Sequence, residues 1–365
     1  MPVPGNTLVE IFLNRVAKTP DFVALRGKVD GAWKPTTFRE FGSQAREAAN
    51  GLIALGVQKG DCVSILSGNR PEWHITDVSI MLAGATSVPI YVTNSPTQVA
   101  YVVGHSDSVV ALVENQDQLD KILKTKKEVP KLQKVVVFNG EGSEDDNFVI
   151  SFDELKRLGR EHEKANPSAL DERIKAVVPD DLATIVYTSG TTGDPKGAML
   201  THGGFAWTLD ALGKVLPFHD GTDRVVSYLP LSHIFERLTS DWGGIYFGVD
   251  VWFAESIEKL LPNLQECKPT FFIGVPRVYE KFYMGLKAKI AEHPKKELVE
   301  KAIHLGSEKV ALEQAGKSIP IGMKLKYGLL NKVVLSKLRE GLGMGNVRFA
   351  VTGAAPIEPE IIKFI

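Results

Sequence analysis

The sequence has few cysteines, almost no net charge and no long apolar run. Cys62 and Cys267 are the only cysteines in 365 residues, and their separation gives no metal-binding or redox spacing, which favours reduced thiols. Lysine plus arginine number 43 against 44 acidic residues, so a net charge of −1 gives no electrostatic basis for a nucleic-acid partner. We therefore expect no nucleic acid among the ligands.

Two kinds of segment are also missing. No stretch of about 18 apolar residues occurs, so no transmembrane helix is predicted. The opening residues MPVPGNTLVEIF lack the basic region and apolar run of a secretory signal. These absences, with the low cysteine content, predict a cytoplasmic protein.

The composition is that of a large globular chain, with 44% hydrophobic and 24% charged residues. Short apolar segments, such as residues 62–66 and 86–90, alternate with helical patterns, which predicts an α/β fold with mostly parallel sheets flanked by helices. Thr37 with Glu40 predicts a capping box. We expect two stacked α/β lobes, an N-terminal lobe at 1–178 and a second lobe at 179–365.

Residues 187–197, YTSGTTGDPKG, combine glycines, hydroxyls and one lysine directly after an apolar strand. Glycines allow positive φ and close approach of the backbone N–H groups to an anion. Hydroxyls can donate to phosphate or coordinate Mg²⁺, and Lys196 adds a positive charge. Lys196 lies between Pro195 and Gly197, so this is not the Walker pattern. A polyphosphate loop is predicted, and a mobile turn between two strands is the alternative.

The longer run YTSGTTGDPKGAMLTH, residues 187–202, resembles the signature of the AMP-forming adenylating enzymes, which include acyl-CoA synthetases, luciferases and peptide-synthetase adenylation domains. The resemblance implies that a carboxylate reacts with ATP, releases pyrophosphate and passes its acyl group to a thiol, usually that of coenzyme A. We assign Thr188 to the Mg²⁺ side of the site and to catalysis with Lys196. The residues assigned to phosphate binding are Thr188, Ser189, Gly190, Thr191, Thr192, Gly193 and Lys196.

Residues 228–237, YLPLSHIFER, resemble a second motif of the family at the carboxyl edge of a sheet. The resemblance implies that His233 lies beside the reacting carboxylate and the α-phosphate. Glu236 and Arg237 match the long-chain acyl-CoA synthetase version, and either a substrate role or an intrahelical or interlobe ion pair is open for them. Ile234 and Phe235 stand where amino-acid-activating relatives often place an aspartate, which favours an apolar substrate.

Two further motifs lie in the last third of the chain. Residues 274–283, GVPRVYEKFY, resemble long-chain synthetases, and we interpret Arg277 as a structural link between loops. Residues 351–360, VTGAAPIEPE, resemble the segment that lies against adenine in the family. The small residues assigned to nucleotide binding there are Gly353, Ala354, Ala355 and Pro356.

The resemblance covers the large N-terminal domain of an acyl-adenylate-forming enzyme, without its later barrel part and C-terminal domain. It implies a long-chain fatty acid CoA ligase, with ATP, Mg²⁺, coenzyme A and a fatty acid as ligands. The alternatives are a nucleotide-binding fragment without turnover, or a fatty acyl-AMP ligase or amino-acid adenylation domain. Peripheral membrane contact and a homodimer are left open, and no amphipathic basic helix stands out in the sequence.

Overall fold

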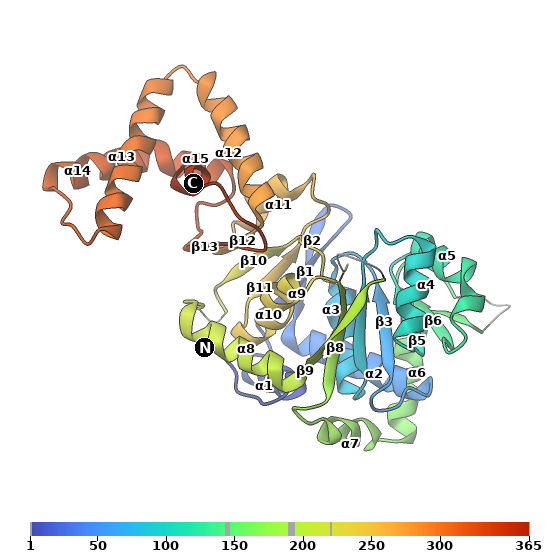
Figure 1. Cartoon of the computed structure of the whole chain (residues 1–365). Helices are drawn as coiled ribbons and strands as arrows, with labels where there is room; N and C mark the ends of the chain where they lie inside the picture. The colour runs from blue at the N-terminus through green and yellow to red at the C-terminus, as the bar shows by residue number, and fades with distance from the viewer. Residues whose placement is uncertain (1, 143–146, 189–193, 220, 365) are drawn as a thin grey trace. The chain divides into compact units, whose positions relative to one another are not determined.

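A computed structural model describes residues 2–142, 147–188, 194–219 and 221–364 (Figure 1). The chain forms two compact units. The first contains Met1–Asp223 and Ser227–Phe253, and the second contains Arg224–Val226 and Ala254–Ile365. Strand β10 (Arg224–Ser227) is therefore divided between them.

The first unit is built on a seven-stranded sheet with the order β7-β6-β5-β3-β4-β8-β9. The pairs from β7 to β8 are parallel, whereas β9 runs antiparallel to β8. The strands are β3 (Cys62–Leu66), β4 (Thr86–Ile90), β5 (Val110–Val113), β6 (Lys134–Val137), β7 (Val149–Ser151), β8 (Leu182–Thr188) and β9 (Lys196–Thr201). The predicted α/β class with a mostly parallel sheet is confirmed.

Helices cover both faces of this sheet, with α2, α3 and α6 on one side and α4 and α5 on the other (Figure 1). Because both faces are covered, every residue of β4 and β5 is buried, and β5 has the continuous apolar sequence VALV that such burial favours. The helices are α1 (Leu8–Lys18), α2 (Phe38–Ala54), α3 (Pro71–Leu82), α4 (Pro96–His105), α5 (Gln116–Lys124), η1 (Lys126–Glu128), α6 (Phe152–Ala165), α7 (Ala169–Ala176) and α8 (His202–Val215).

Local capping signals set several of these helix starts. Thr37 accepts a hydrogen bond from the backbone N–H of Glu40, and the Glu40 carboxylate accepts from the backbone N–H of Thr37, which confirms the predicted capping box. Ser95 caps α4 in the same way with Gln98. Asp30 and Gly31, both at positive φ, form the two-residue turn between β1 (Val23–Val29) and β2 (Ala32–Thr37).

The same unit contains a second set of strands, in which β1 pairs antiparallel with β2 and parallel with β11 (Asp250–Phe253). Before β11, the sequence predicted one continuous helix over residues 235–247. The structure instead has α9 (Ile234–Glu236), a turn of π-helix η2 (Arg237–Asp241) and α10 (Trp242–Phe247). The interruption accompanies two fully buried charged side chains, Arg237 and Asp241.

The second unit is mainly helical, with one parallel pair of strands, β12 (Phe271–Gly274) and β13 (Phe349–Thr352). Its helices are α11 (Leu260–Cys267), α12 (Pro276–Ala291), α13 (Lys296–Gln314), α14 (Ile321–Leu330), the π-helical turn η3 (Asn331–Leu335), α15 (Ser336–Gly341) and α16 (Pro359–Phe364). Within the described ranges, no helix combines the length and the apolar character needed to cross a membrane.

The division into units does not coincide with the predicted boundary between 178 and 179. Strands β8 and β9, which follow that boundary in the sequence, complete the seven-stranded sheet of the first unit. The alternation of strands and helices shows that an α/β unit continues, but it does not show which sheet each strand joins. The predicted second lobe of alternating strands is therefore replaced by a helical unit with one pair of strands.

Candidate active site

The two ends of the predicted phosphate loop lie opposite each other in the β8–β9 ladder. Thr188, the last residue of β8, is the direct cross-strand partner of Lys196, the first residue of β9. Both residues are exposed. Directly opposed residues in an antiparallel pair have Cβ atoms about 4.5–5.5 Å apart, so one anion can contact both side chains. Five predicted anion-binding residues lie outside the described ranges: Ser189, Gly190, Thr191, Thr192 and Gly193.

Lys196 has the properties expected of an anion-binding cation. Among the residues that the structure describes, no carboxylate pairs with its ammonium group. No described carboxylate therefore neutralises this charge. An exposed ammonium on a flexible stem can follow the oxygens of a phosphate group as the ligand binds.

Gly197 has a different role from the one its sequence context indicated. It lies within β9 and is not among the described glycines with positive φ. A Cβ atom at this position would lie 2.6 Å from Cγ2 of Ile185 and 3.3 Å from Cζ of Tyr187. Glycine is needed here because the hairpin packs closely on itself, so the prediction that Gly197 contributes to an anion nest is wrong.

Two tyrosines and a histidine form a cluster that supports the loop. Tyr101 and His105 lie on α4, and Tyr187 lies on β8. The Tyr101 hydroxyl donates to the carbonyl oxygen of Pro195 at 3.1 Å, and the rings of Tyr101 and His105 stack with centroids 5.3 Å apart. The Tyr187 hydroxyl lies 2.8 Å from Nδ1 of His105, and burial raises the pKa of Tyr187 to about 12. Tyr187 therefore stays protonated near neutral pH, and the tautomer of His105 sets which of the two groups donates. Sequence analysis did not find Tyr101 or His105, because both lie more than 80 residues before the loop.

Replacing Tyr101 with phenylalanine is expected to weaken ATP binding by roughly 2- to 10-fold, because one hydrogen bond that holds the loop is lost. Calorimetric titration with ATP measures the effect. Tyr283→Phe is the matched control, since its hydroxyl donates to Glu360 in the second unit. Equal ATP affinity in the Tyr101→Phe variant and the wild type would show that the contact does not position the loop.

The second predicted motif is held by Asn69, which follows the carboxyl end of β3. Its amide nitrogen donates to the Ser227 hydroxyl at 2.9 Å and to the carbonyl oxygen of Leu229 at 2.7 Å. Its amide oxygen accepts from the backbone N–H of Leu231 at 3.2 Å. One side chain thus fixes both ends of the turn before His233. No sequence signal pointed to Asn69.

His233 is the N-cap residue of α9, and its side chain is exposed. Its Nδ1 atom accepts a hydrogen bond from the backbone N–H of Phe235 at 3.1 Å. In the neutral ring, this contact places the proton on Nε2. The cap therefore leaves an N–H donor, well suited to a carboxylate or phosphate oxygen.

Arg237 forms a buried ion pair. Its guanidinium donates to both carboxylate oxygens of Asp77, at 2.7 and 2.6 Å, and to the hydroxyl of Thr184 at 2.5 Å. Trp242 also donates to Asp77, at 3.0 Å. The side chains of Arg237 and Asp77 are fully buried. Of the two roles left open for Arg237, the structure supports the ion pair between the predicted lobes, since Asp77 lies 160 residues earlier.

A second acidic group competes for the same cation. Asp241 lies 3.9 Å from Nε of Arg237, and burial together with the charge of Asp77 raises the pKa of Asp241 well above its ordinary value. His74 lies 3.3 Å from Asp241, but burial lowers its pKa to about 3, so the imidazole is neutral near pH 7. One guanidinium therefore neutralises Asp77, and burial beside Asp77 favours the protonated form of Asp241.

Glu236 is also part of the buried network. Its Oε1 atom accepts from the hydroxyls of Ser227 at 2.7 Å and Ser240 at 2.8 Å. Burial raises the pKa of Glu236 to about 7, despite these hydrogen bonds. Because the carboxyl is 3% exposed and is occupied by two serines, it is not presented to a substrate. The Glu236 carboxyl therefore has a structural role, but its partners are serine hydroxyls and not the cation of the predicted ion pair.

The titration of Glu236 predicts a pH effect on stability. The folded state holds this proton between pH 4.5 and 7, where the unfolded chain releases it, so the free energy of unfolding falls as pH rises through this window. Relative to Glu236→Gln, we expect the wild type to lose about 2 kcal/mol between pH 5 and pH 8. Urea unfolding at several pH values tests this. The test compares how the free energy of unfolding of the two proteins changes with pH, so a difference that is the same at every pH does not count. If the free energy of unfolding changes equally with pH in both proteins, the prediction is contradicted.

In the second unit, the predicted adenine segment follows the carboxyl end of β13. Thr352 pairs in parallel register with Gly274, so residues 353–356 emerge beside the end of β12. Ala354 has φ +68°, a left-handed conformation that is uncommon for alanine. The Thr352 hydroxyl is buried and has no hydrogen-bond partner among the described residues. The turn therefore consists mainly of backbone groups and small side chains. No described residue uses the hydrogen-bonding capacity of the Thr352 hydroxyl.

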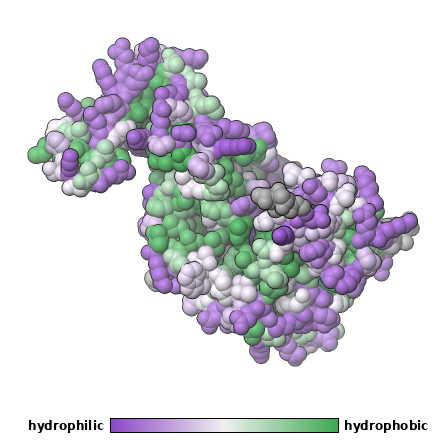
Figure 2. All heavy atoms as spheres, viewed as in Figure 1, coloured by the Kyte–Doolittle hydropathy of each residue, from purple (hydrophilic) through white to green (hydrophobic). Residues whose placement is uncertain are grey.

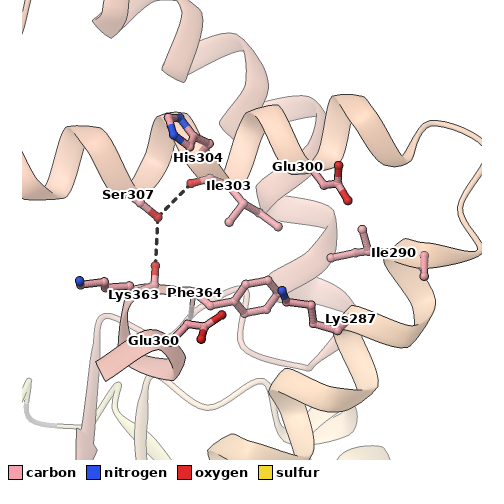
Figure 3. A pocket seen from close by; sticks show the side chains of 10 residues that line it. Lys287, Ile290, Glu300, Ile303, His304, Ser307, Glu360, Lys363 and Phe364 are labelled. Atoms are coloured by element: carbon pink, nitrogen blue, oxygen red, sulfur yellow. Dashed lines mark hydrogen bonds between the residues drawn. The ribbon is translucent and has the colours of Figure 1, made fainter. Parts of the chain in front are cut away.

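A pocket of about 370 Å³ also lies in the second unit, between α12, α13 and α16 (Figure 3). Ser307 closes one side by donating to the carbonyl oxygens of Ile303 and Lys363, each at 3.1 Å. Glu360, the last residue of the 351–360 motif, lines this pocket, but none of the residues assigned to phosphate or nucleotide binding does. Arg277, at the start of α12, is exposed and has no partner among the described residues, so its role as a link between loops stays a prediction.

Comparison with known proteins identifies the family. The profile described as "AMP-binding enzyme" matches residues 12–365, nearly the whole chain. The chain belongs to the AMP-binding enzyme family. The family predicted from residues 187–202 is thereby confirmed.

Two curated relatives of this chain are both named long-chain-fatty-acid–CoA ligase. The long-chain-fatty-acid–CoA ligase ACSBG2 of Xenopus laevis is 36% identical over 370 residues, which cover 99% of this chain and 49% of the relative. The long-chain-fatty-acid–CoA ligase FadD15 of Mycobacterium bovis is 35% identical over 94% of this chain and 56% of the relative. The chain spans about half the length of the curated relatives it matches.

Two solved structures of other proteins share the fold. A long-chain-fatty-acid-CoA ligase (FadD1) from Archaeoglobus fulgidus aligns with a TM-score of 0.70 at 19% identity, over 100% of this chain and 60% of that one. The A-PCP didomain of carboxylic acid reductase from Segniliparus rugosus, in complex with AMP, aligns with a TM-score of 0.68 at 21% identity, over 98% of this chain and 50% of that one. At these identities the likeness establishes the fold of this AMP-binding chain.

Proposed function

We propose that the protein containing this chain is an AMP-forming long-chain fatty acid CoA ligase, and that this chain supplies its ATP-binding part. The observation that carries the proposal is the placement of Thr188 and Lys196 on opposite sides of the loop at the end of β8. The carboxyl ends of parallel strands are the usual ligand edge of such sheets. The shared name of relatives that are 33–36% identical supports the substrate class.

In the first half-reaction, a fatty carboxylate oxygen forms a bond to the α-phosphorus of ATP. The bond from that phosphorus to the oxygen bridging to the β-phosphate breaks, and pyrophosphate leaves with the bonding electrons. Lys196 and Thr188 hold the phosphates that leave. The nucleophile is already an anion, so positioning and charge neutralisation are the main tasks of the protein.

His233 serves the acyl side of the site in this proposal. With Nδ1 engaged by Phe235, Nε2–H donates to an oxygen of the carboxylate or of the α-phosphate and orients the two groups. In the second half-reaction, the thiol sulfur of coenzyme A bonds to the acyl carbonyl carbon and AMP leaves. The thiol proton passes to solvent.

Mg²⁺ fits the described residues at Thr188. This ion usually takes one or two protein oxygens, with phosphate oxygens and water completing its shell. Thr188 offers an exposed hydroxyl beside the phosphate loop. When bound, the ion would neutralise charge on the phosphates. In the ranges that the structure covers, no cluster of three or more acidic, histidine or cysteine side chains offers a complete protein-only site.

Gly353, Ala354, Ala355 and Pro356 are proposed to contact adenine. Their side chains are absent or short, so a flat base can approach the backbone closely. Ile234 and Phe235, both partly buried after His233, favour an apolar acid over an amino acid. Each methylene buried from a longer acid would contribute about 0.8 kcal/mol. A cytoplasmic location and a homodimer stay predictions of the sequence.

The test is carboxylate-dependent exchange of labelled pyrophosphate into ATP, with acids from acetate to palmitate. We expect exchange with long acids only, which would establish adenylation and substrate class together. Thioester formation by the intact protein separates a CoA ligase from a fatty acyl-AMP ligase. Exchange only with amino acids contradicts the proposal, and ATP binding without exchange favours a nucleotide-binding module.

A further inference from the structure

Helix α14 carries an apolar stripe that the fold leaves uncovered. Ile321, Leu325 and Leu329 are 78%, 72% and 66% exposed, and Val333 in η3 is 48% exposed. These residues recur every four positions, and each step of four turns about 40° around a helix. They therefore form one continuous stripe. Figure 2 shows hydrophobic and hydrophilic surface side by side at the α14 end of the second unit.

The stripe is not the face through which this helical segment packs on its own unit. Leu330, Val334 and Leu338 belong to the core cluster that contains Val299 and Ile303 of α13. These inward residues lie on the opposite side of the segment from Leu325. The segment α14–α15 thus has one apolar face in the core and a second apolar face exposed to water.

Positive charge surrounds the exposed stripe. Residues 315–339 contain Lys317, Lys324, Lys326, Lys332, Lys337 and Arg339 and no acidic residue. Lys324 and Lys326 adjoin Leu325 in the sequence and lie on either side of the stripe. Among the described residues, none of the five lysines forms an ion pair with a carboxylate. The basic patch is therefore concentrated at the stripe in a chain with a net charge of only −1.

The apolar stripe and the lysines beside it together indicate which kind of partner this surface binds. An apolar stripe flanked by unpaired lysines is the pattern of helices that lie in a membrane interface, where the apolar face enters the acyl region and the lysines meet anionic headgroups. A second copy of this helix would bring like charges together, which disfavours a symmetric contact. Charge complementarity therefore selects an anionic lipid surface.

We propose that α14 docks this protein on the surface of an anionic membrane, with Ile321, Leu325 and Leu329 inserted and the flanking lysines on the headgroups. From the sequence alone, no amphipathic basic helix stands out. Leu330, Val334 and Leu338 make the segment apolar on a second side, so its periodicity is hidden until the packing separates the two faces. The proposal depends on this surface and not on the ligase reaction.

Sedimentation with lipid vesicles tests the proposal on the whole chain. We expect binding to vesicles of phosphatidylcholine mixed with phosphatidylglycerol, weaker binding to phosphatidylcholine alone, and a decrease as salt is added. Lys324→Gln with Lys326→Gln should weaken binding to the anionic vesicles by about 30-fold, or about 5-fold per lysine. Leu325→Ser with Leu329→Ser should weaken it by roughly 100-fold.

The controls are exposed residues elsewhere. Lys124→Gln with Lys127→Gln removes two exposed lysines at α5 and η1, and Val215→Ser changes a side chain that is 75% exposed on α8. Both controls should bind vesicles like the wild type. The proposal is overturned if the wild type does not bind anionic vesicles, or if the α14 variants bind as well as the controls. Concentration-dependent dimerisation that Leu325→Ser with Leu329→Ser abolishes, without vesicle binding, assigns the stripe to a second copy instead.

Discussion

Replacing Arg237 with methionine is expected to lower the free energy of unfolding of the first unit by about 3–5 kcal/mol. The substitution leaves the Asp77 carboxylate buried with its two guanidinium hydrogen bonds removed. The Thr184 hydroxyl loses a partner at the same time. Urea unfolding followed by tryptophan fluorescence measures the change, because Trp73 and Trp242 are both buried beside the pair.

Two controls show whether the loss comes from the unpaired charge. Arg237→Met combined with Asp77→Leu removes both charges, and should recover most of the stability that Arg237→Met loses. Arg157→Met breaks exposed ion pairs to Glu154 and Glu161, and should change stability by less than about 1 kcal/mol. A loss of similar size in Arg237→Met and Arg157→Met would contradict the role of the buried pair.

Replacing Lys196 with alanine is expected to weaken ATP binding by roughly 10- to 100-fold, because a charge-assisted hydrogen bond to phosphate is lost. Stability should stay close to that of the wild type, since the side chain is exposed and has no partner among the described residues. Calorimetry gives the ATP affinity, and pyrophosphate exchange gives the effect on the first half-reaction.

Lys164→Ala is the matched control for this prediction, because Lys164 is also exposed but lies on α6, outside the predicted site. It should leave ATP affinity and exchange unchanged. Lys196→Arg keeps the charge and should retain more affinity than Lys196→Ala. If Lys196→Ala binds ATP like the wild type, the proposed role of the loop is wrong.

The elements that the sequence predicted well are those set by neighbouring residues. The Thr37–Glu40 capping box depends on contacts within three positions. The strands at 62–66 and 86–90 could be predicted because each is a short, mostly apolar segment, as burial on both faces of a sheet favours. The loop motif, residues 187–197, identified the family because its glycines, hydroxyls and lysine are contiguous.

The supports of the site could not be predicted in this way. Tyr101 reaches Pro195 across 94 positions, and Asn69 reaches Leu229 across 160. Nothing in the residues around Tyr101 or Asn69 differs from an ordinary helix or loop. Their contacts exist because β3, β4 and β8 lie near one another in the sheet, and this order is not written in any local pattern.

The sequence by itself determined the α/β class, many helix and strand positions and the family, because sterics, capping and burial periodicity act over short distances. The tertiary structure decided that β8 and β9 join the first unit, that Arg237 neutralises Asp77, and that α14 exposes one of its two apolar faces. These outcomes depend on which distant segments meet. Which segments pack together depends on how much apolar surface and how many charges the whole folded chain can bury and neutralise. The role of a residue such as Arg237 is therefore fixed only by its tertiary partners.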